Sequence, residues 1–411
     1  MTPVPPPVDP SSREEEARAE MAATRGGAAT VRWLVAFPVA LLVLALALEG
    51  MAIARGESRV VGPLRAVSVG ANAATGLRAA NARLLAAARE IENRFDEGSA
   101  LARTIRPWGQ LALTAALGYG NEESYVGRDG HLVFRDDFDH LTARGPLAAL
   151  GSGDPVATTL DFARELRARG IALLLLPVPV KPSLEPERFS AAAQRGPLPS
   201  PRDRAFADAL TSHVDELHLF DPTALFAAPA GETPPYLERD THWRPATMDA
   251  VARELAMRLR ALADLPEGDP ARWSESDEVV DGLGDSAKLL GLPETFPFYV
   301  RERANLRPVR AAGGGPWRPE RNAPVLLLGD SFTAIYSTPE LGFGASAGLA
   351  ERLAFHLGLP VDRIVENAGG ASATRAALAK DPSRLDGVRA VVWELAAREL
   401  TVGDWSPTPL D

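Results

Sequence analysis

Residues 171–178 read IALLLLPV, and this run decides the fold class of the chain. It is continuously apolar and has the length of a strand, which is typical of a strand buried on both faces of a sheet. A second run of the same kind, APVLLL, occupies residues 323–328. Shorter apolar stretches predict further strands at residues 218–220, 363–365 and 388–393. The chain therefore contains the strands of a buried, parallel sheet.

Segments with helical periodicity separate these strands. Apolar residues recur at helical spacing over residues 156–169, 203–216, 246–262, 345–357 and 372–379. Strands that alternate with helices indicate a parallel sheet covered by helices on both faces. The predicted fold class is therefore α/β.

Two segments depart from this alternation. Residues 123–134, ESYVGRDGHLVF, predict a hairpin, because Asp129-Gly130 provides a turn between two short strands. Residues 264–322 are rich in Pro, Gly and Asp, and we expect them to form a loop-rich insertion near one edge of the sheet.

The first part of the chain has a different character. Residues 1–30 are rich in Pro, Ala and charge without apolar periodicity, which predicts a disordered tail. Residues 33–54 are apolar apart from Glu49 and would form a helix of about 33 Å, long enough to cross a bilayer. We therefore expect a single transmembrane anchor at residues 31–54. A cleavable signal peptide is the alternative, but its charged leading region would be unusually long.

Two further regions are expected after the anchor. Residues 55–120 are expected to form a helical stalk, on the strength of the Ala/Arg-rich residues 72–95. Residues 121–411 then form the main domain. With one span near the N-terminus, we expect residues 55–411 to lie outside the cytoplasm, in the periplasm, with the anchor in the inner membrane.

Composition excludes several classes of function. The chain has 44 basic and 54 acidic residues and a net charge of −10, which argues against a nucleic-acid binder. It has no cysteine, which excludes disulfides, thiolate nucleophiles, cysteine-ligated zinc and iron–sulfur clusters.

Two short motifs carry the residues of an acyl-transfer site. Asp240-Thr-His242 precedes a predicted helix, and Gly329-Asp-Ser331 directly follows a predicted strand. A serine hydroxyl needs a base to take its proton, and the base needs a carboxylate to fix its tautomer. Ser331, His242 and Asp240 supply these three groups. Simpler roles remain open, because Asp330 or Ser331 could be a helix N-cap, Asp240 could cap the helix that opens near Pro245, and His242 could be a structural histidine. Asp-x-His alone offers too few ligands for a metal site.

The combination of motifs resembles the SGNH hydrolase-like domain of the alginate O-acetyltransferases, the AlgJ/AlgX type. Further matching segments are residues 125–134, 177–182, 367–370 and 391–398. Ordinary SGNH esterases carry the serine first, whereas here Asp240 and His242 precede Ser331, as in the acetyltransferase type. Because few residues follow Arg398, we expect no C-terminal carbohydrate-binding module and a layout closer to AlgJ.

The resemblance implies a role for each site residue. Ser331 would be the nucleophile, His242 the general base and acid, and Asp240 the carboxylate that orients His242. The Ser331 N–H, Asn367 and Gly369 are the candidates for the oxyanion hole. Lys181, Glu394 and Arg398 also match family positions, and we expect them to be architectural.

The function implied is that of a membrane-anchored O-acetyltransferase. It would move acetyl through an acetyl-serine onto hydroxyls of an exported polysaccharide, with a multispanning membrane-bound O-acyltransferase supplying the acetyl group. No metal or soluble cofactor is implied. Tyr236, Trp243 and Trp317 are candidates for stacking on the sugar and equally for the core. The alternatives are a carbohydrate acetylesterase, which uses the same three residues with water as acceptor, and a non-catalytic scaffold of an export assembly.

Overall fold

A computed structural model describes residues 28–56, 99–145, 147, 153–193, 196–226, 234–296, 298–367 and 369–410. The chain divides into two units, residues 1–109 and residues 110–411. Most of the predicted tail, at residues 1–27, and all of the Ala/Arg-rich residues 72–95 lie outside the described residues.

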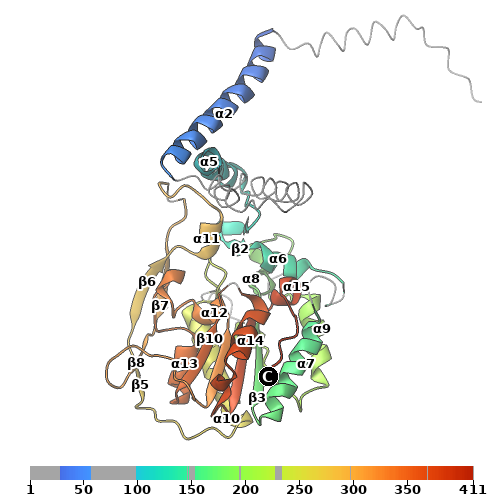
Figure 1. Ribbon diagram of the computed structural model, residues 1–411, viewed down its shortest axis with the longest axis vertical. Coiled ribbons are helices and arrows are strands. Elements are labelled where there is room, and N and C mark those ends of the chain that lie inside the picture. The colour runs from blue at the N-terminus through green and yellow to red at the C-terminus, as the bar shows by residue number, and fades with distance from the viewer. Residues whose placement is uncertain are drawn as a thin grey trace, which may run out of the picture. The chain divides into compact units, whose positions relative to one another are not determined.

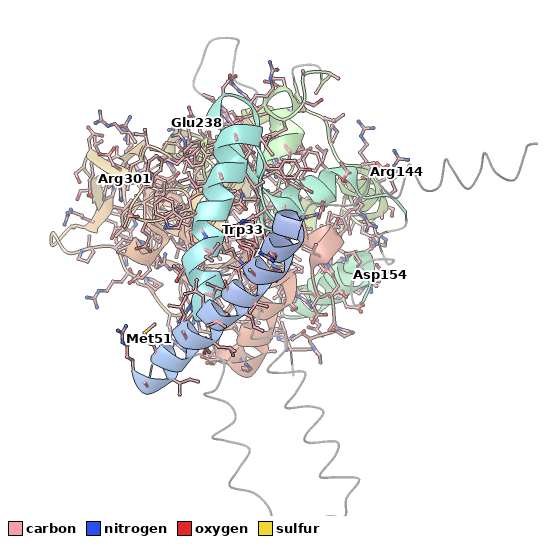
Figure 2. All side chains as sticks on the ribbon, turned by 90° about the horizontal axis from the view of Figure 1, so that it is seen from above. Trp33, Met51, Arg144, Asp154, Glu238 and Arg301 are labelled. Carbon is pink, nitrogen blue, oxygen red and sulfur yellow. The ribbon has the colours of Figure 1, made fainter. Side chains whose placement is uncertain are left out.

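The first unit contains a long apolar helix, α2 (Ala28–Ala54). In Figure 2, Trp33 and Met51 lie toward its opposite ends. Within the described part of the chain, one helix is long and apolar enough to cross a membrane, over the 19 residues Ala36–Ala54. Its side chains are mostly exposed, which distinguishes it from a core helix. A second helix, α5 (Ala100–Leu117), begins in this unit and continues into the next.

A five-stranded parallel sheet forms the centre of the second unit (Figure 1). Its strand order is β10-β9-β11-β3-β4, and every neighbouring pair is parallel. The strands are β3 (Ala172–Val178), β4 (His218–Leu219), β9 (Val325–Gly329), β10 (Val361–Val365) and β11 (Ala390–Ala396). Because all five run the same way, their carboxyl ends meet at one edge, where doubly wound sheets bind their ligands.

Helices cover both faces of this sheet, which confirms the predicted α/β class. Alternate residues of β3 belong to two separate cores: Leu174 and Leu176 lie in one, and Leu173 and Leu175 in the other. The first core includes the helices α10 (Pro245–Leu262) and α13 (Leu349–Leu357). The second includes α7 (Pro155–Ala168), α9 (Pro201–Thr211) and α14 (Gly370–Lys380).

The segment 264–322 is more regular than the predicted loops. It contains two antiparallel ribbons, in which β5 (Trp273–Glu275) pairs with β8 (Val309–Ala311) and β6 (Glu278–Gly282) pairs with β7 (Glu302–Leu306). The short helix α11 (Asp285–Leu289) lies between β6 and β7 in sequence. Strands of three to five residues are too short to stand out against Pro and Gly in the sequence.

The predicted hairpin at residues 123–134 is confirmed. β1 (Ser124–Val126) pairs with β2 (Leu132–Phe134), and the turn places Asp129 and Gly130 at positive φ, 54° and 80°. The remaining short helices are α6 (Arg135–Thr142), α8 (Lys181–Leu184), α12 (Ser331–Ala334) and α15 (Glu399–Val402). Single 3₁₀ turns occur at Arg128–Gly130, Pro186–Arg188, Thr223–Phe226, Pro339–Leu341 and Pro382–Leu385.

Candidate active site

Asp240 and His242 lie in a tight loop that leads into α10. The loop is closed by a bridge between Tyr236 and Trp243 and by a hydrogen bond from the Leu237 N–H to the His242 carbonyl, at 3.1 Å. At its tip, Asp240 Oδ1 accepts the backbone N–H of His242 at 2.9 Å, which is an Asx turn. The same oxygen lies 2.6 Å from Nδ1 of the His242 ring. The one-residue spacing therefore allows one carboxylate to fix both the backbone and the ring of His242.

The other ring nitrogen of His242 faces Ser331. Nε2 lies 2.8 Å from the Ser331 Oγ, although the two residues are 89 positions apart in the chain. Asp240 is fully buried and His242 nearly so, whereas Ser331 is partly exposed. Because an ionised carboxylate only accepts, the ring proton belongs on Nδ1, and Nε2 is left to accept the serine proton.

Ser331 is presented by the turn between β9 and α12. Asp330 is the N-cap: its Oδ1 accepts the Phe332 N–H at 2.8 Å, and its Oδ2 accepts the Ala396 N–H at 2.9 Å. Of the two candidates for the cap, Asp330 is the N-cap and Ser331 is the first helical residue. A Cβ on Gly329 would lie 2.1 Å from the Thr333 Oγ1, so the turn requires glycine there.

Glu394 supports this turn from β11. Its Oε2 accepts the Asp330 N–H at 3.0 Å and the Thr333 hydroxyl at 2.8 Å. Burial, together with the nearby Asp330 carboxylate, holds the pKa of Glu394 well above its usual range. The shift favours the neutral form of Glu394, which supports the turn through its hydrogen bonds.

The other two family positions also join elements around the site. Lys181 is fully buried, and its Nζ donates to the carbonyls of Leu132 at 2.6 Å, Glu238 at 2.8 Å and Asp240 at 3.3 Å. It connects the hairpin to the Asp240 loop. Arg398 donates to the Asp137 carboxylate at 2.9 Å. These contacts support the architectural interpretation.

The insertion holds the loop from its other side. Glu302 on β7 accepts the N–H of Glu238 at 2.8 Å and of Arg239 at 3.1 Å, and it pairs with Arg244 at 2.9 Å. The segment 264–322 therefore contacts the Asp240 loop through Glu302, and it also packs on α10 and α13.

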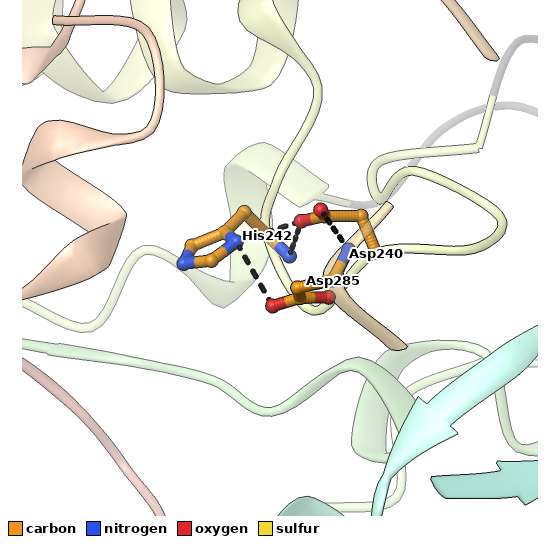
Figure 3. A group of neighbouring side chains, drawn as sticks. All are labelled: Asp240, His242 and Asp285. Atoms are coloured by element: carbon orange, nitrogen blue, oxygen red, sulfur yellow. Dashed lines mark hydrogen bonds and ion pairs between the residues drawn. The ribbon is translucent and has the colours of Figure 1, made fainter. Parts of the chain in front are cut away.

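Sequence reasoning missed Asp285, the first residue of α11. Its backbone N–H donates to the Asp240 Oδ2 at 2.8 Å, and its own Oδ2 lies 3.6 Å from the His242 Nδ1 (Figure 3). One signal was present, because the tripeptide Gly-Asp-Ser occurs twice, at residues 284–286 and 329–331.

The charges around His242 favour its protonated form. Burial lowers the pKa of His242, but the Asp240 and Asp285 carboxylates outweigh it and raise the pKa above the ordinary value. For Asp240, burial acts to raise the pKa, but the charge and hydrogen bonds of His242 prevail and lower it. Burial and the Asp240 charge raise the pKa of Asp285.

Asp240, His242 and Asp285 also meet a geometric test for a metal site, since their ligand atoms lie within 4.8 Å of one another. Both oxygens of Asp240 and Oδ1 of Asp285 already accept backbone N–H groups. A cation on Nδ1 would displace the proton that this nitrogen shares with Asp240. The arrangement fits the positioning of an imidazole better than the binding of a metal.

The three aromatic candidates for sugar stacking lie in the core. Tyr236 and Trp243 are fully buried and Trp317 is 5% exposed, so none offers a free face to a sugar. Their interpretation as stacking surfaces is therefore wrong. Trp243 instead joins the two motifs, because its Nε1 donates to the Phe332 carbonyl at 3.2 Å.

The oxyanion candidates lie at the ends of β9 and β10. Val365 on β10 pairs with Gly329 on β9, so Asn367 stands two residues beyond one strand as Ser331 does beyond the other. Asn367 is exposed. The Ser331 N–H has no acceptor within its own helix because it is the first helical residue. The Gly369 N–H points at the Glu366 carbonyl at 3.4 Å, which makes it the weakest of the three candidates.

Fold and site together define an SGNH hydrolase-like domain, with a serine, a histidine and an aspartate in line. Residues 125–397 match the family described as "SGNH hydrolase-like domain, acetyltransferase AlgX", and the chain belongs to this family, of the AlgJ/AlgX type. It is 27% identical over 228 residues to the probable alginate O-acetylase AlgJ of Pseudomonas aeruginosa, covering 53% of this chain and 56% of the relative. For the AlgJ of Pseudomonas fluorescens, the identity is 25% over 257 residues, covering 60% and 62%. The chain thus spans less than two thirds of the length of these relatives.

A solved structure shares the fold. It is the O-acetyltransferase domain of Pseudomonas putida AlgJ, with a TM-score of 0.52 and 20% identity, covering 68% of this chain and 92% of that domain.

Proposed function

We propose that this chain is an O-acetyltransferase that moves an acetyl group through an acetyl-Ser331 onto a hydroxyl of a polysaccharide. The observation that carries the proposal is the line of hydrogen-bonding distances from Asp240 Oδ1 through His242 to the Ser331 Oγ, 2.6 Å and 2.8 Å. The names of the relatives, probable alginate O-acetylases, support acetyl as the group and a polysaccharide as the acceptor.

The first half-reaction acylates the serine. The Ser331 Oγ attacks the acetyl carbonyl while its proton passes to the His242 Nε2. The tetrahedral intermediate places its negative oxygen near the Ser331 N–H and Asn367, which we propose as the oxyanion donors. When the intermediate collapses, the bond to the leaving group breaks, and that group takes the proton from Nε2.

The second half-reaction transfers the acetyl group. A sugar hydroxyl gives its proton to the His242 Nε2 and attacks the acetyl-serine carbonyl. The bond to the Ser331 Oγ breaks, and this oxygen recovers the proton from Nε2. The enzyme returns to its starting state, and the sugar carries the ester.

The organisation of the chain supports a site outside the cytoplasm. We propose that residues 31–54, which make up most of α2 (Ala28–Ala54), are an uncleaved single-pass anchor after the tail predicted at residues 1–30. Residues 55–120 would be the stalk and residues 121–411 the catalytic domain, in the periplasm. A multispanning membrane-bound O-acyltransferase, which passes the acetyl group across the membrane, is the proposed source of acetyl.

The test is transfer by the full chain in detergent, with an activated acetyl ester as donor and a panel of oligosaccharides that includes alginate fragments. Mass spectrometry follows acetylated sugar and free acetate together. The proposal expects acetylated sugar that disappears in Ser331→Ala. Free acetate without sugar product would identify an acetylesterase, and turnover that persists in Ser331→Ala would overturn the site assignment.

A further inference from the structure

We propose that Asp285 is a positioning residue for His242: a second carboxylate that holds the Asp240–His242 turn and adds a negative charge beside Nδ1. Asp240 remains the acceptor of the Nδ1 proton. The inference rests on the proposed function, because it assigns Asp285 to the same reaction.

Reciprocal hydrogen bonds join α11 to the turn. The Asp285 N–H donates to the Asp240 Oδ2 at 2.8 Å, and the Asp285 Oδ1 accepts the Thr241 N–H at 2.7 Å. Thr241 is the residue between Asp240 and His242, so Asp285 bonds both to Asp240 and to the residue that joins Asp240 to the histidine. A shift of α11 would therefore move Asp240 and His242 together.

Close packing brings α11 to this position. A Cβ on Gly284 would lie 2.0 Å from the Arg239 carbonyl oxygen, so only glycine allows the backbone of α11 to approach the loop. The Ala287 N–H donates to the same carbonyl at 3.2 Å. The two segments are thus locked together by main-chain contacts beside the site.

The second oxygen of Asp285 is directed at the ring. Oδ2 lies 3.6 Å from the His242 Nδ1, as Figure 3 shows, which is too long for a hydrogen bond and short enough for a strong charge interaction. The Asp285 side chain is 34% exposed, whereas that of Asp240 has no exposure. Asp285 is therefore a partly solvent-exposed carboxylate beside a buried histidine.

Within the described residues, charged groups from three elements act on the pKa of His242. Asp240 faces it from its own loop and Asp285 from α11, while Arg398, which is paired with Asp137, acts in the opposite direction from beyond β11. Two carboxylates on the Nδ1 side make Nε2 a stronger base toward a sugar hydroxyl. Loss of one of them weakens that base.

An acidic residue in the first turn of a helix is also common for structural reasons alone. The Asp285→Asn variant separates the two roles, because asparagine keeps the backbone N–H and a side-chain oxygen for Thr241 but removes the charge. The matched control is Asp281→Asn on β6, whose carboxylate is exposed and pairs with Arg303 at 3.6 Å. Asp285→Glu retains the charge.

The experiment measures kcat against pH for the full chain and these variants, with an activated acetyl ester. For Asp285→Asn we expect the acidic limb to move about one pH unit lower and the plateau to fall roughly tenfold, with KM unchanged. Asp285→Glu should keep the acidic limb near its wild-type position, even if its plateau rate is lower than that of the wild type. Asp281→Asn should match the wild type in both limb and plateau. If the acidic limbs of Asp285→Asn and wild type coincide while Ser331→Ala is inactive, the role of Asp285 is overturned and the proposed function is not.

A second readout needs no turnover. NMR titration of the His242 ring, assigned with His242→Gln, should give a lower midpoint in Asp285→Asn than in the wild type. An unchanged midpoint would also overturn the inference. Activity that survives in Ser331→Ala would instead overturn the proposed function, so the two failures are distinguishable.

Discussion

Asp240 holds His242 twice with one oxygen. Its Oδ1 accepts the backbone N–H of His242 at 2.9 Å and lies 2.6 Å from Nδ1 of the ring. The turn that fixes the chain therefore also fixes the ring and its tautomer. This explains how a carboxylate and a base only two positions apart can act on one serine.

The Asp240→Asn variant tests this relationship. Asparagine replaces one carboxylate oxygen with an NH2 group, so it cannot accept from the two N–H groups of His242 and from the Asp285 N–H at once, and it removes the negative charge beside Nδ1. We expect kcat to fall on the order of 10³- to 10⁴-fold with KM little changed. Steady-state kinetics and circular dichroism of the variant check the prediction. A loss of less than tenfold in a folded variant would contradict it.

The pH dependence follows from the charge balance at His242. Burial lowers its pKa, but Asp240 and Asp285 raise it above 6.5. Because the base must be neutral, the acidic limb of kcat/KM, which reports the free enzyme, should have its midpoint above pH 6.5, and activity should rise with pH through that point. A rate profile from pH 5 to 9 tests this, and a midpoint below 6.5 would refute it.

The raised pKa of His242 also makes the stability of the fold depend on pH. A group whose pKa is higher in the folded state than in the unfolded state stabilises the fold. The full contribution is present at pH values below the pKa of the unfolded state, and it is lost as pH rises through the pKa of the folded state. The difference in unfolding free energy between wild type and His242→Gln should therefore be greatest below pH 6.5 and shrink above it. Urea titrations at several pH values measure the difference, and a gap that widens with pH would be inconsistent with the charge balance.

Much of this architecture was predictable because the sheet is buried on both faces. The strand expected at residues 171–178 is Ala172–Val178, and the helix expected at residues 156–169 is Pro155–Ala168. The order of the two motifs, each placed next to a predicted element, also identified Ser331, His242 and Asp240 as the residues to examine.

What escaped prediction depends on contacts between distant segments. Asp285 meets Asp240 across 45 positions, from a five-residue helix without apolar periodicity. Trp243 fits a sugar platform and a core equally well by residue type, and only its burial decides between them.

The core position of Trp243 leads to a further prediction. Trp243→Phe keeps an aromatic ring but removes the Nε1–H bond to the Phe332 carbonyl, which joins the histidine loop to the serine helix. We expect the free energy of unfolding to fall by about 1 kcal/mol and kcat to fall while KM stays the same. Denaturant titration and kinetics measure both. A raised KM with unchanged kcat would indicate a sugar contact instead.

Two variants of Glu394 test how the turn that carries Ser331 is held. Burial and the Asp330 charge raise the pKa of Glu394 and favour its neutral form, and Glu394→Gln keeps a neutral side-chain oxygen for the Asp330 N–H and the Thr333 hydroxyl. We expect this variant to lose less than about 1 kcal/mol, whereas Glu394→Ala should lose about 1–3 kcal/mol because it leaves buried donors unpaired. Chemical denaturation compares the two. Equal losses would argue against a hydrogen-bonding role.

The most direct measurement is to trap the acetyl group on the enzyme. The full chain is mixed with an activated acetyl ester, quenched in acid, digested and analysed by peptide mass spectrometry. The account predicts one acetyl group on the peptide that contains Ser331, absent in Ser331→Ala and discharged when an acceptor oligosaccharide is added before the quench. Acetyl transfer to sugar without any acetyl-Ser331 on the reaction pathway would contradict the account.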